Sequence, residues 1–244
     1  MKILLICHAE NYHALAFTTL FKRFSGKDDS GDSLYISVPA EFHDLYRYQK
    51  RVDSIFVDNP KEDFDICYNV FPSSSGCEIL NRCQSDQKIG YAFEDNKIVG
   101  THQAAEKLKN CLLNKQKTNK SLLQIFHNVC KFSWHGQGYN LHYFPRTKTK
   151  KNKTGIAVAD DSIRKYIKDN LNLQMSEIWH VPLRKNLLKR LDEINRVDRI
   201  VTDDLFTAHA GSSLRKHVEF IDLHNNCVPI EFFGRGRSHT VSNI

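Results

Sequence analysis

The first half of the chain alternates short apolar runs with segments of helical periodicity. Four such runs predict buried strands, at 2–7, 33–39, 53–58 and 64–71. The segment 12–24 places its apolar residues close to helical spacing and predicts a helix directly after the first strand. Another amphipathic helix is predicted over 121–132, with Ser121 as its N-cap.

The second half repeats this alternation more regularly. Strands are predicted at 154–160, 177–183, 198–203 and 217–223, the last of them being the final strand, and helices at 161–171, 185–197 and 206–216. Repeated strand–helix units imply parallel sheets with right-handed crossovers and helices on both faces. The pattern therefore predicts two similar α/β halves joined near residue 150.

Composition agrees with a globular, intracellular protein. With 244 residues, of which 41% are hydrophobic, the chain is able to bury a core. The first apolar run is too short for a signal peptide or a membrane span, and His8 and Glu10 follow it at once, so we expect a cytoplasmic protein. Seven cysteines without a CxxC pair indicate reduced, mostly buried thiols rather than a zinc site or a disulfide framework.

The formal charge of +7 and the pI near 9.0 raise the question of an anionic partner. Five cations fall within 146–153, namely Arg146, Lys148, Lys150, Lys151 and Lys153. This run is either a solvated linker or a patch for an anionic lipid, a glycolipid or nucleic acid. A nucleic-acid-binding protein would bind with strong salt dependence, but no aromatic stacking motif supports it, and neither GxGxxG nor GxxxxGK[ST] is present.

Two strand ends carry candidate chemical groups. The strand 198–203 runs into Asp203 and Asp204, where the amides of the next helix favour a phosphate; Asp204 would cap that helix and His209 would face the same rim. The alternative is that Asp204 is only a cap and His209 only a packed helix residue.

After the first strand, Glu10 and His13 are titratable groups suited to proton transfer, although a histidine at a helix start is often structural. Two such strand ends in two facing α/β halves describe a cleft, and the cleft points to an enzyme.

The segment 198–223, "DRIVTDDLFTAHAGSSLRKHVEFIDL", resembles the signature of glycosyltransferase family 9, the ADP-heptose:lipopolysaccharide heptosyltransferases. Asp204 and His209 keep the five-residue spacing of that signature. Three further segments resemble the family in the same order along the chain, at 12–24, 64–91 and 134–146.

The resemblance implies a GT-B fold, in which two Rossmann-like domains face a cleft. It implies an acceptor-side domain at 1–147, a basic linker at 148–154 and a shortened nucleotide-sugar-side domain at 155–244. The implied reaction is an inverting, metal-independent transfer without a cofactor, in which a nucleotide-sugar, with ADP-heptose as a candidate, is the co-substrate.

The resemblance also assigns roles to residues. His13 takes the position of the family's catalytic base, with Glu10 as a neighbouring carboxylate. The donor would be held by one set of residues, namely Asp204, Leu205, Phe206, Thr207, His209, Arg184 and Lys185. Asn11, Arg146 and Lys148 would meet a saccharide or lipopolysaccharide-type acceptor, which leaves open a peripheral association with the inner membrane surface; no nucleic acid is expected.

This chain departs from the family's pattern at two motifs. Tyr12 and His13 replace a Gly-Asp pair, and Leu205 and Phe206 replace a Ser/Thr-Gly corner. The second half also lacks one strand–helix unit. These departures define an alternative, a binding or scaffold protein that keeps the GT-B fold without transferring a sugar.

Overall fold

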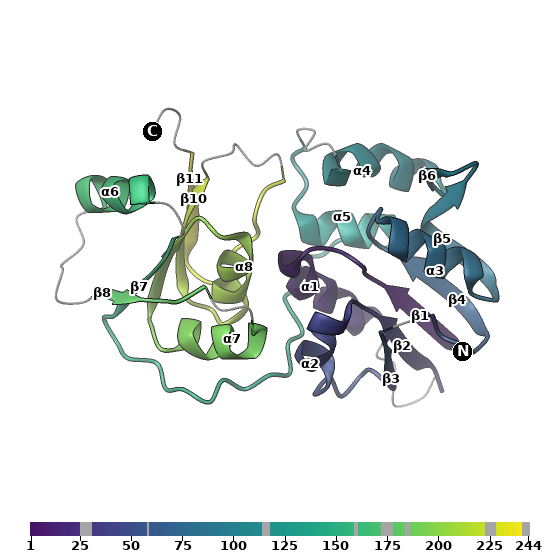
Figure 1. Cartoon of the computed structure of the whole chain (residues 1–244), viewed down its shortest axis with the longest axis horizontal. Coiled ribbons are helices and arrows are strands. Elements are labelled where there is room, and N and C mark those ends of the chain that lie inside the picture. Colours follow the sequence, from purple (N-terminus) through teal and green to yellow (C-terminus); the bar gives the residue numbers. More distant parts are fainter. Residues whose placement is uncertain are drawn as a thin grey trace. The chain divides into compact units, whose positions relative to one another are not determined.

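The computed structural model describes residues 1–24, 31–57, 59–113, 118–158, 161–171, 178–183, 186–222 and 228–240. Two compact units make up the chain. The first contains Met1–Tyr143 and Cys227–Pro229, and the second contains Phe144–Asn226 and Ile230–Ile244. Each unit is built on its own, mainly parallel sheet with helices packed against it (Figure 1).

The sheet of the first unit has the strand order β3-β2-β1-β4-β5-β6. Its strands are β1 (Lys2–Ile6), β2 (Ser33–Ser37), β3 (Ser54–Phe56), β4 (Phe64–Asn69), β5 (Ser85–Glu94) and β6 (Lys97–Gly100). All pairs are parallel except β5 with β6. The four predicted strands are confirmed as β1 to β4, and the order is that of a Rossmann-type sheet with an antiparallel edge strand.

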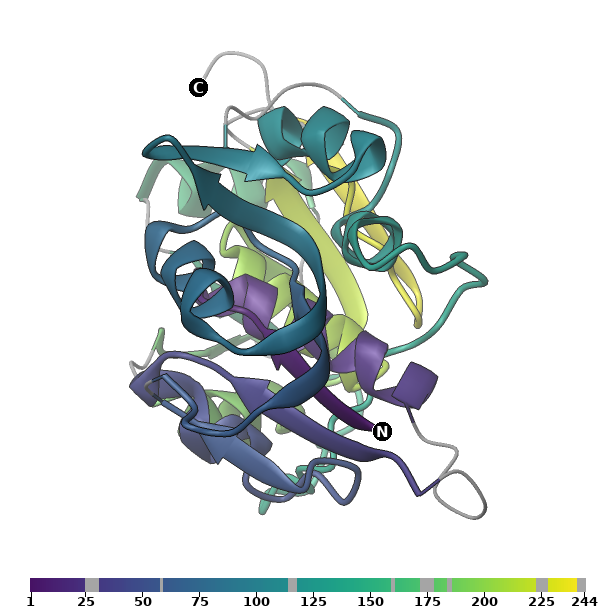
Figure 2. The same ribbon diagram turned by 90° about the vertical axis from the view of Figure 1, so that its right-hand side faces the viewer.

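The hairpin of β5 and β6 was not predicted. Asp95 and Asn96 form its two-residue turn with φ angles of 49° and 60°, the backbone that a type I′ hairpin turn requires. Figure 2 shows the long, twisted β5 leading into β6 beside α4.

The helical segments of the first unit are α1 (Asn11–Phe17), α2 (His43–Tyr46), α3 (Ser74–Arg82), α4 (Gln103–Leu113) and α5 (Leu122–Val129), with 3₁₀ turns at Thr18–Phe24 and Ala40–Phe42. The prediction of one continuous α-helix over 12–24 is wrong. Its α-helical part ends at Phe17, where the hydroxyls of Thr18 and Thr19 donate to the carbonyls of Leu15 and Ala16 at 2.7 and 2.8 Å. Hydroxyls bound to the preceding turn compete with regular helix geometry, and the chain continues as a 3₁₀ helix.

The predicted N-cap at Ser121 is confirmed, because its hydroxyl accepts a hydrogen bond from the amide of Gln124 at 3.3 Å. The helix α5 that it begins buries Ile125 and Val129 against α4.

We expect Ser121→Ala to lower the free energy of unfolding by about 1 kcal/mol, the usual value of a lost N-cap. Chemical denaturation measures this. Ser133→Ala, at an exposed position, is the control and is expected to change stability by less than about 0.5 kcal/mol; an equal loss in both variants would contradict the prediction.

The second unit has a fully parallel sheet in the order β11-β10-β9-β7-β8. Its strands are β7 (Thr154–Ala157), β8 (Ile178–His180), β9 (Arg199–Thr202), β10 (His217–Asp222) and β11 (Gly236–Thr240), and its helices are α6 (Asp161–Asn170), α7 (Leu187–Asn195) and α8 (Leu205–Ser213). The predicted strands and helices of this half are confirmed over their described residues; positions 159–160, 177, 185 and 223 of the predicted ranges lie outside the described part of the chain. The expectation that 217–223 is the final strand is wrong, because β11 pairs with β10; its sequence, GRSHT, has no apolar pattern that identifies a strand.

The helices of the second unit cover opposite faces of its sheet. Ile163 and Ile167 of α6 pack on Ile156, Val201 and Ile221. On the other face, α8 lies close to β9 and β10 at Gly211, where an added Cβ would meet side chains at 2.9 Å. The six described cysteines are free and buried, as predicted; Cys227 lies outside the described residues.

Candidate functional site

In the second unit the predicted corner lies where the topology of the sheet changes direction. β7 and β9 are neighbours, but α6 follows β7 on one face and α8 follows β9 on the other. Ligands of open α/β sheets bind outside the carboxyl ends of the strands at such a switch point. Asp203 and Asp204 directly follow β9, so they stand at this position.

Hydrogen bonds fix the backbone of the corner. The hydroxyl of Thr202 donates to the carbonyl of Ala157 at 2.7 Å and accepts from the amide of Asp204 at 3.0 Å, which ties the ends of β7 and β9 together. The Asp204 carboxylate accepts from the amide of Thr207 at 2.6 Å. Asp204 is therefore the N-cap of α8, as predicted.

Arg190, which was not among the predicted site residues, packs against the buried side of the corner. Its guanidinium forms an ion pair with Asp204 and donates to the hydroxyl of Thr207 at 2.7 Å. It also lies over the ring of Phe206, 5.0 Å from the centroid, and only 6% of its side chain is exposed. A signal for it exists in the sequence, because it shares helical spacing with the buried Leu187, Leu191 and Ile194 of α7.

The structure places only some of the predicted donor-binding residues together at this corner. The structure brings Asp204, Phe206 and Thr207 together around Arg190, and it leaves Asp204 and Leu205 partly exposed. Phe206 is buried, so its ring is not open to a ligand from solvent. Arg184 and Lys185 lie outside the described residues.

His209 lies inside the unit rather than at the rim. It is 2% exposed, and burial lowers its pKa to about 4 although the charge of Asp204 opposes the shift. Its imidazole is consequently neutral at pH 7 and does not offset the charge of a phosphate. The spacing of Asp204 and His209 corresponds here to a capping residue and a core residue of one helix.

The first unit has a similar switch point at the carboxyl ends of β1 and β4. Beyond β1, the ring of His8 hydrogen bonds to the hydroxyl of Ser37 at 3.1 Å, at the end of β2. Glu10 occupies the N-cap position of α1, but its exposed side chain does not cap that helix. Asn11 is exposed on the first turn. His8 was not among the predicted site residues, although its place directly after a strand was visible in the sequence.

His13 is embedded in aromatic side chains. It is 2% exposed, and its ring centroid lies 3.9 Å from that of Tyr12 and 4.4 Å from that of Phe71. Burial, and next the charge of Glu10, raise the pKa of the neighbouring Tyr12 to about 12. Of the two predicted catalytic residues, Glu10 is the one whose side chain is open to solvent.

The basic run lies against the carboxyl end of α7. The amide of Arg146 donates to the Asp192 carboxylate at 2.7 Å, and the side-chain amide of Asn195 donates to the carbonyl of Thr147 at 2.6 Å. The buried Lys216 adds a hydrogen bond to the hydroxyl of Thr149 at 2.7 Å. The backbone of the run is thus held to the second unit, while the side chains of Arg146 and Lys148 are exposed.

The described residues contain neither a cluster suited to a metal ion nor a helix suited to a membrane. None of their groups of three or more His, Cys, Asp and Glu residues has the arrangement to hold a metal ion. Among the same residues, no helix has the length and apolar character needed to cross a membrane.

Comparison with known proteins gives different results for sequence and structure. No family model matches the sequence, and no curated protein matches it either. A family 9 glycosyltransferase from Veillonella parvula is similar in structure, with a TM-score of 0.65 and 9% identity, over 98% of this chain and 86% of that one. The chain has the fold of family 9 glycosyltransferases.

Two heptosyltransferases from E. coli show the same likeness. WaaC, solved with ADP-2-deoxy-2-fluoro heptose, matches with a TM-score of 0.63 and 9% identity over 97% of this chain and 93% of its own. ADP-heptose lps heptosyltransferase II matches with a TM-score of 0.57 and 11% identity over 99% and 91%. The predicted fold class, α/β and GT-B-like with two Rossmann-like sheets, is therefore confirmed.

Proposed function

We propose that the protein is a glycosyltransferase that moves a sugar from a nucleotide-diphosphate-sugar to a hydroxyl of a saccharide or glycoconjugate. The observation that carries this proposal is the likeness to family 9 structures over nearly the whole chain, including WaaC with an ADP-sugar analogue. The proposed transfer inverts the anomeric centre and uses no metal, and ADP-heptose is the first donor to try.

In this proposal the donor lies in front of α8. The amides of Leu205 and Phe206 open the helix, and first-turn amides have no partner within a helix, so they attract the diphosphate. Asp204 repels a phosphate but fixes the helix N-terminus through its bonds to Thr207 and Arg190. We assign Asp204, Thr207 and Arg190 to shaping the corner, with Arg184 and Lys185 as the cations that neutralise the phosphates.

Glu10 is the proposed base that takes the proton of the acceptor hydroxyl. Its carboxylate is exposed at the switch point of the first sheet, whereas His13 is buried and its ring packs against those of Tyr12 and Phe71. Asn11 beside it, and the exposed Arg146 and Lys148, are proposed contacts of an anionic, lipopolysaccharide-type acceptor. Such an acceptor would bring the protein to the membrane surface.

Donor binding is tested by calorimetry with ADP-, UDP- and GDP-sugars, ADP-heptose among them. We expect one of them to bind with a dissociation constant between about 1 μM and 1 mM, the range of typical Michaelis constants. Leu205→Glu is expected to weaken binding at least about tenfold, because it adds a negative charge where the diphosphate lies. A carboxylate in the first turn is favourable for the helix itself, so the variant should fold.

The matched control for this experiment is Leu113→Glu, which adds the same charge at a position of the first unit that is 46% exposed. It should bind the donor like the wild type. Folded wild-type protein that binds none of the nucleotide-sugars would contradict the proposed function, and an equal loss in both variants would contradict the placement of the donor at α8.

One observation favours the alternative of a binding or scaffold protein with a GT-B fold. The amide and hydroxyl of Thr207 are already engaged by Asp204 and Arg190, so part of the corner serves the protein's own structure. A protein of this kind would bind a nucleotide-sugar, or none, without releasing a nucleoside diphosphate in the presence of saccharide acceptors.

A further inference from the structure

One face of the second sheet carries charged residues where a parallel sheet normally carries apolar ones. Side chains alternate between the faces of a strand, so Arg199, His217, Glu219, Arg237 and His239 share the face on which α6 packs. We call these five residues the Glu219 cluster. They lie toward the amino ends of β9 and β10 and along β11, beyond the part that α6 covers.

Both oxygens of the Glu219 carboxylate are fully used within this cluster. Oε1 accepts from Arg199 at 3.0 Å, and Nε2 of His217 lies 3.1 Å from the same oxygen. Oε2 accepts from Arg237 at 2.7 Å and from His239 at 2.6 Å. Glu219 itself is 0% exposed, whereas Arg237 is 64% and His217 40% exposed. One buried carboxylate therefore holds four basic side chains in place at the surface.

The cluster has an excess of positive charge. Burial raises the pKa of Glu219, but the hydrogen bonds from Arg237 and His239 and the charge of Arg199 outweigh this effect and bring it to about 2. The single negative charge of Glu219 is outnumbered by the two arginine charges, so the cluster is positive even when both histidines are neutral. Arg237 donates its Nε–H to Glu219, and within the described part of the chain the donors on its two terminal nitrogens remain for another acceptor.

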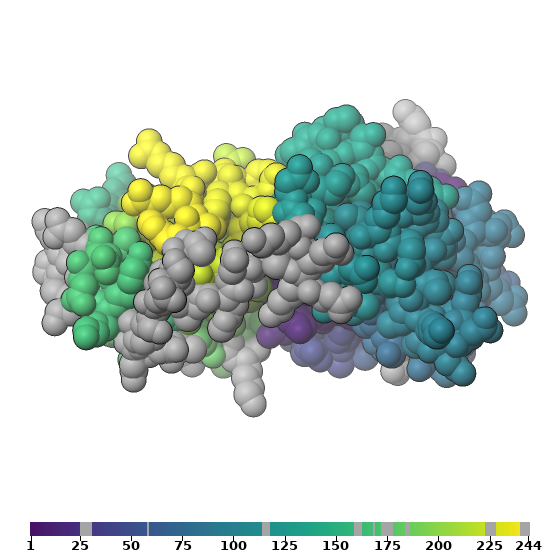
Figure 3. Space-filling view, turned by 90° about the horizontal axis from the view of Figure 1, so that it is seen from above, coloured from purple at the N-terminus to yellow at the C-terminus, as the bar shows by residue number. Residues whose placement is uncertain are grey.

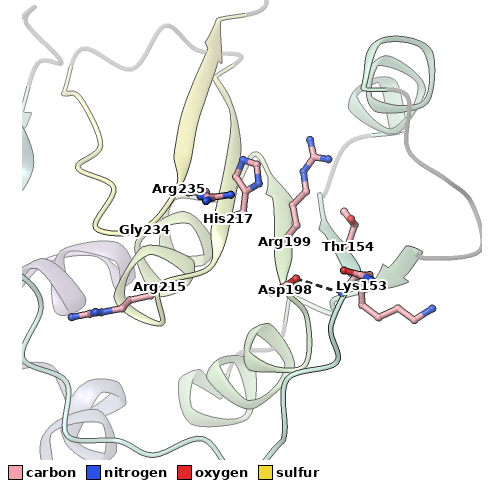
Figure 4. A pocket seen from close by; sticks show the side chains of 9 residues that line it. Lys153, Thr154, Asp198, Arg199, Arg215, His217, Gly234 and Arg235 are labelled. Carbon is pink, nitrogen blue, oxygen red and sulfur yellow. Dashed lines mark hydrogen bonds between the residues drawn. The ribbon is translucent and has the colours of Figure 1, made fainter.

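A cavity of about 670 Å³ adjoins this cluster (Figure 4). Besides Arg199 and His217, its lining includes Arg235, which Figure 4 shows beside the His217 ring. Arg215 and Lys153 also line the cavity and lie on opposite sides of it in this view. Burial, and then the charges of Arg199, Arg237 and Arg235, lower the pKa of His217 against the effect of Glu219. Among the described residues, Arg235 makes no ion pair, and Asp198 is the one acidic residue of the lining.

We propose that the cavity and the Glu219 cluster form a binding site for a phosphate monoester, with Arg199, Arg235 and Arg237 as its ligands. Guanidinium groups match the oxygens of a phosphate dianion in geometry and charge, and a carboxylate that orients them preorganises the site. The cavity is large enough for the phosphate and the group that bears it. Part of the segment around β11 is visible at the surface in Figure 3. Arg235 and Arg237 are exposed, so their guanidinium groups are open to a ligand from solvent.

This site is separate from the proposed donor corner. Thr154, Arg199 and His217 begin β7, β9 and β10, so the cavity lies at the amino ends of the strands, while Asp204 follows a carboxyl end. In a parallel sheet the amino ends and the carboxyl ends of the strands lie on opposite sides of the sheet. The inference therefore does not depend on the proposed transfer reaction.

The first test is calorimetric titration with inorganic phosphate in a phosphate-free buffer at fixed ionic strength. We expect the wild type to bind and Arg235→Gln to raise the dissociation constant about tenfold, since a charge-assisted hydrogen bond is lost. Arg235 makes no ion pair among the described residues, so this variant should fold; Arg237→Gln, with its melting temperature measured alongside, should show the same loss. The control is Arg82→Gln with Lys107→Gln, which removes two exposed cations of the first unit.

The second test separates a soluble ligand from a lipid headgroup. Cosedimentation is measured with phosphatidylcholine vesicles that contain either phosphatidic acid, a phosphate monoester, or phosphatidylglycerol, a diester, at equal mole fraction. Greater binding to phosphatidic acid that is lost in Arg235→Gln supports a headgroup ligand; binding of phosphate without that preference supports a soluble monoester. The proposal is wrong if the wild type does not bind phosphate, or if Arg235→Gln and Arg237→Gln match the control in both tests.

Discussion

Glu10→Gln is expected to lower the turnover number by about 10² to 10⁴, the range that a general base contributes. The amide keeps the size of the side chain but does not take the proton of the acceptor hydroxyl. Because Glu10 is exposed and its side chain does not cap α1, the melting temperature should stay within the error of the measurement. Donor affinity should also be unchanged, since the donor is bound by the second unit in this proposal.

The measurement is the release of nucleoside diphosphate from the bound nucleotide-sugar in the presence of a saccharide acceptor. Glu41→Gln, which removes an exposed carboxylate elsewhere in the first unit, is the control. His13→Phe keeps an aromatic ring between Tyr12 and Phe71 and removes the titratable group. If turnover falls in His13→Phe and persists in Glu10→Gln, the base is His13 and the prediction is wrong.

The fold was predictable to the extent that it rests on buried strands. β1 and β4 are central and mainly apolar, so their runs stand out in the sequence, and the repeated strand–helix alternation implied parallel pairing. β11 was missed because it is a polar edge strand whose ladder depends on β10, and β5 with β6 because a turn of Asp95 and Asn96 is a weaker signal than Asn-Gly.

The candidate site was predictable in its place along the chain but not in its contacts. A strand that ends in Asp203 and Asp204 before a helix indicates a capped corner at a sheet edge, and the structure has one. Sequence spacing does not tell which way a helical residue faces when both faces of the helix are apolar, as in α8, so the sequence left open whether His209 faces the rim or the core. Arg190 comes from another helix, and its pairing with Asp204 exists only in the folded unit.

Asp204→Ala is expected to lower the free energy of unfolding by about 3 to 5 kcal/mol, the cost of leaving a buried charge without its partner. Arg190 is 6% exposed and would keep its charge beside an apolar methyl group, and α8 would lose its N-cap. Asp204→Asn keeps an oxygen that caps the helix, so its loss should be smaller, about 1.5 to 3 kcal/mol for a hydrogen bond to a charged group. Chemical denaturation measures both, and a loss below about 1 kcal/mol in Asp204→Ala would contradict the buried ion pair.

The double variant Asp204→Asn with Arg190→Met separates structure from donor binding. It removes both charges and fills the space with an apolar chain, so it should regain most of the stability that Asp204→Asn loses, because a buried ion pair is often replaceable by packing. If Asp204 only shapes the corner, as we propose, any donor affinity that Asp204→Asn loses should be regained in the double variant together with stability. If stability recovers while the nucleotide-sugar still fails to bind, Asp204 itself touches the donor, and its role as a positioning residue is wrong.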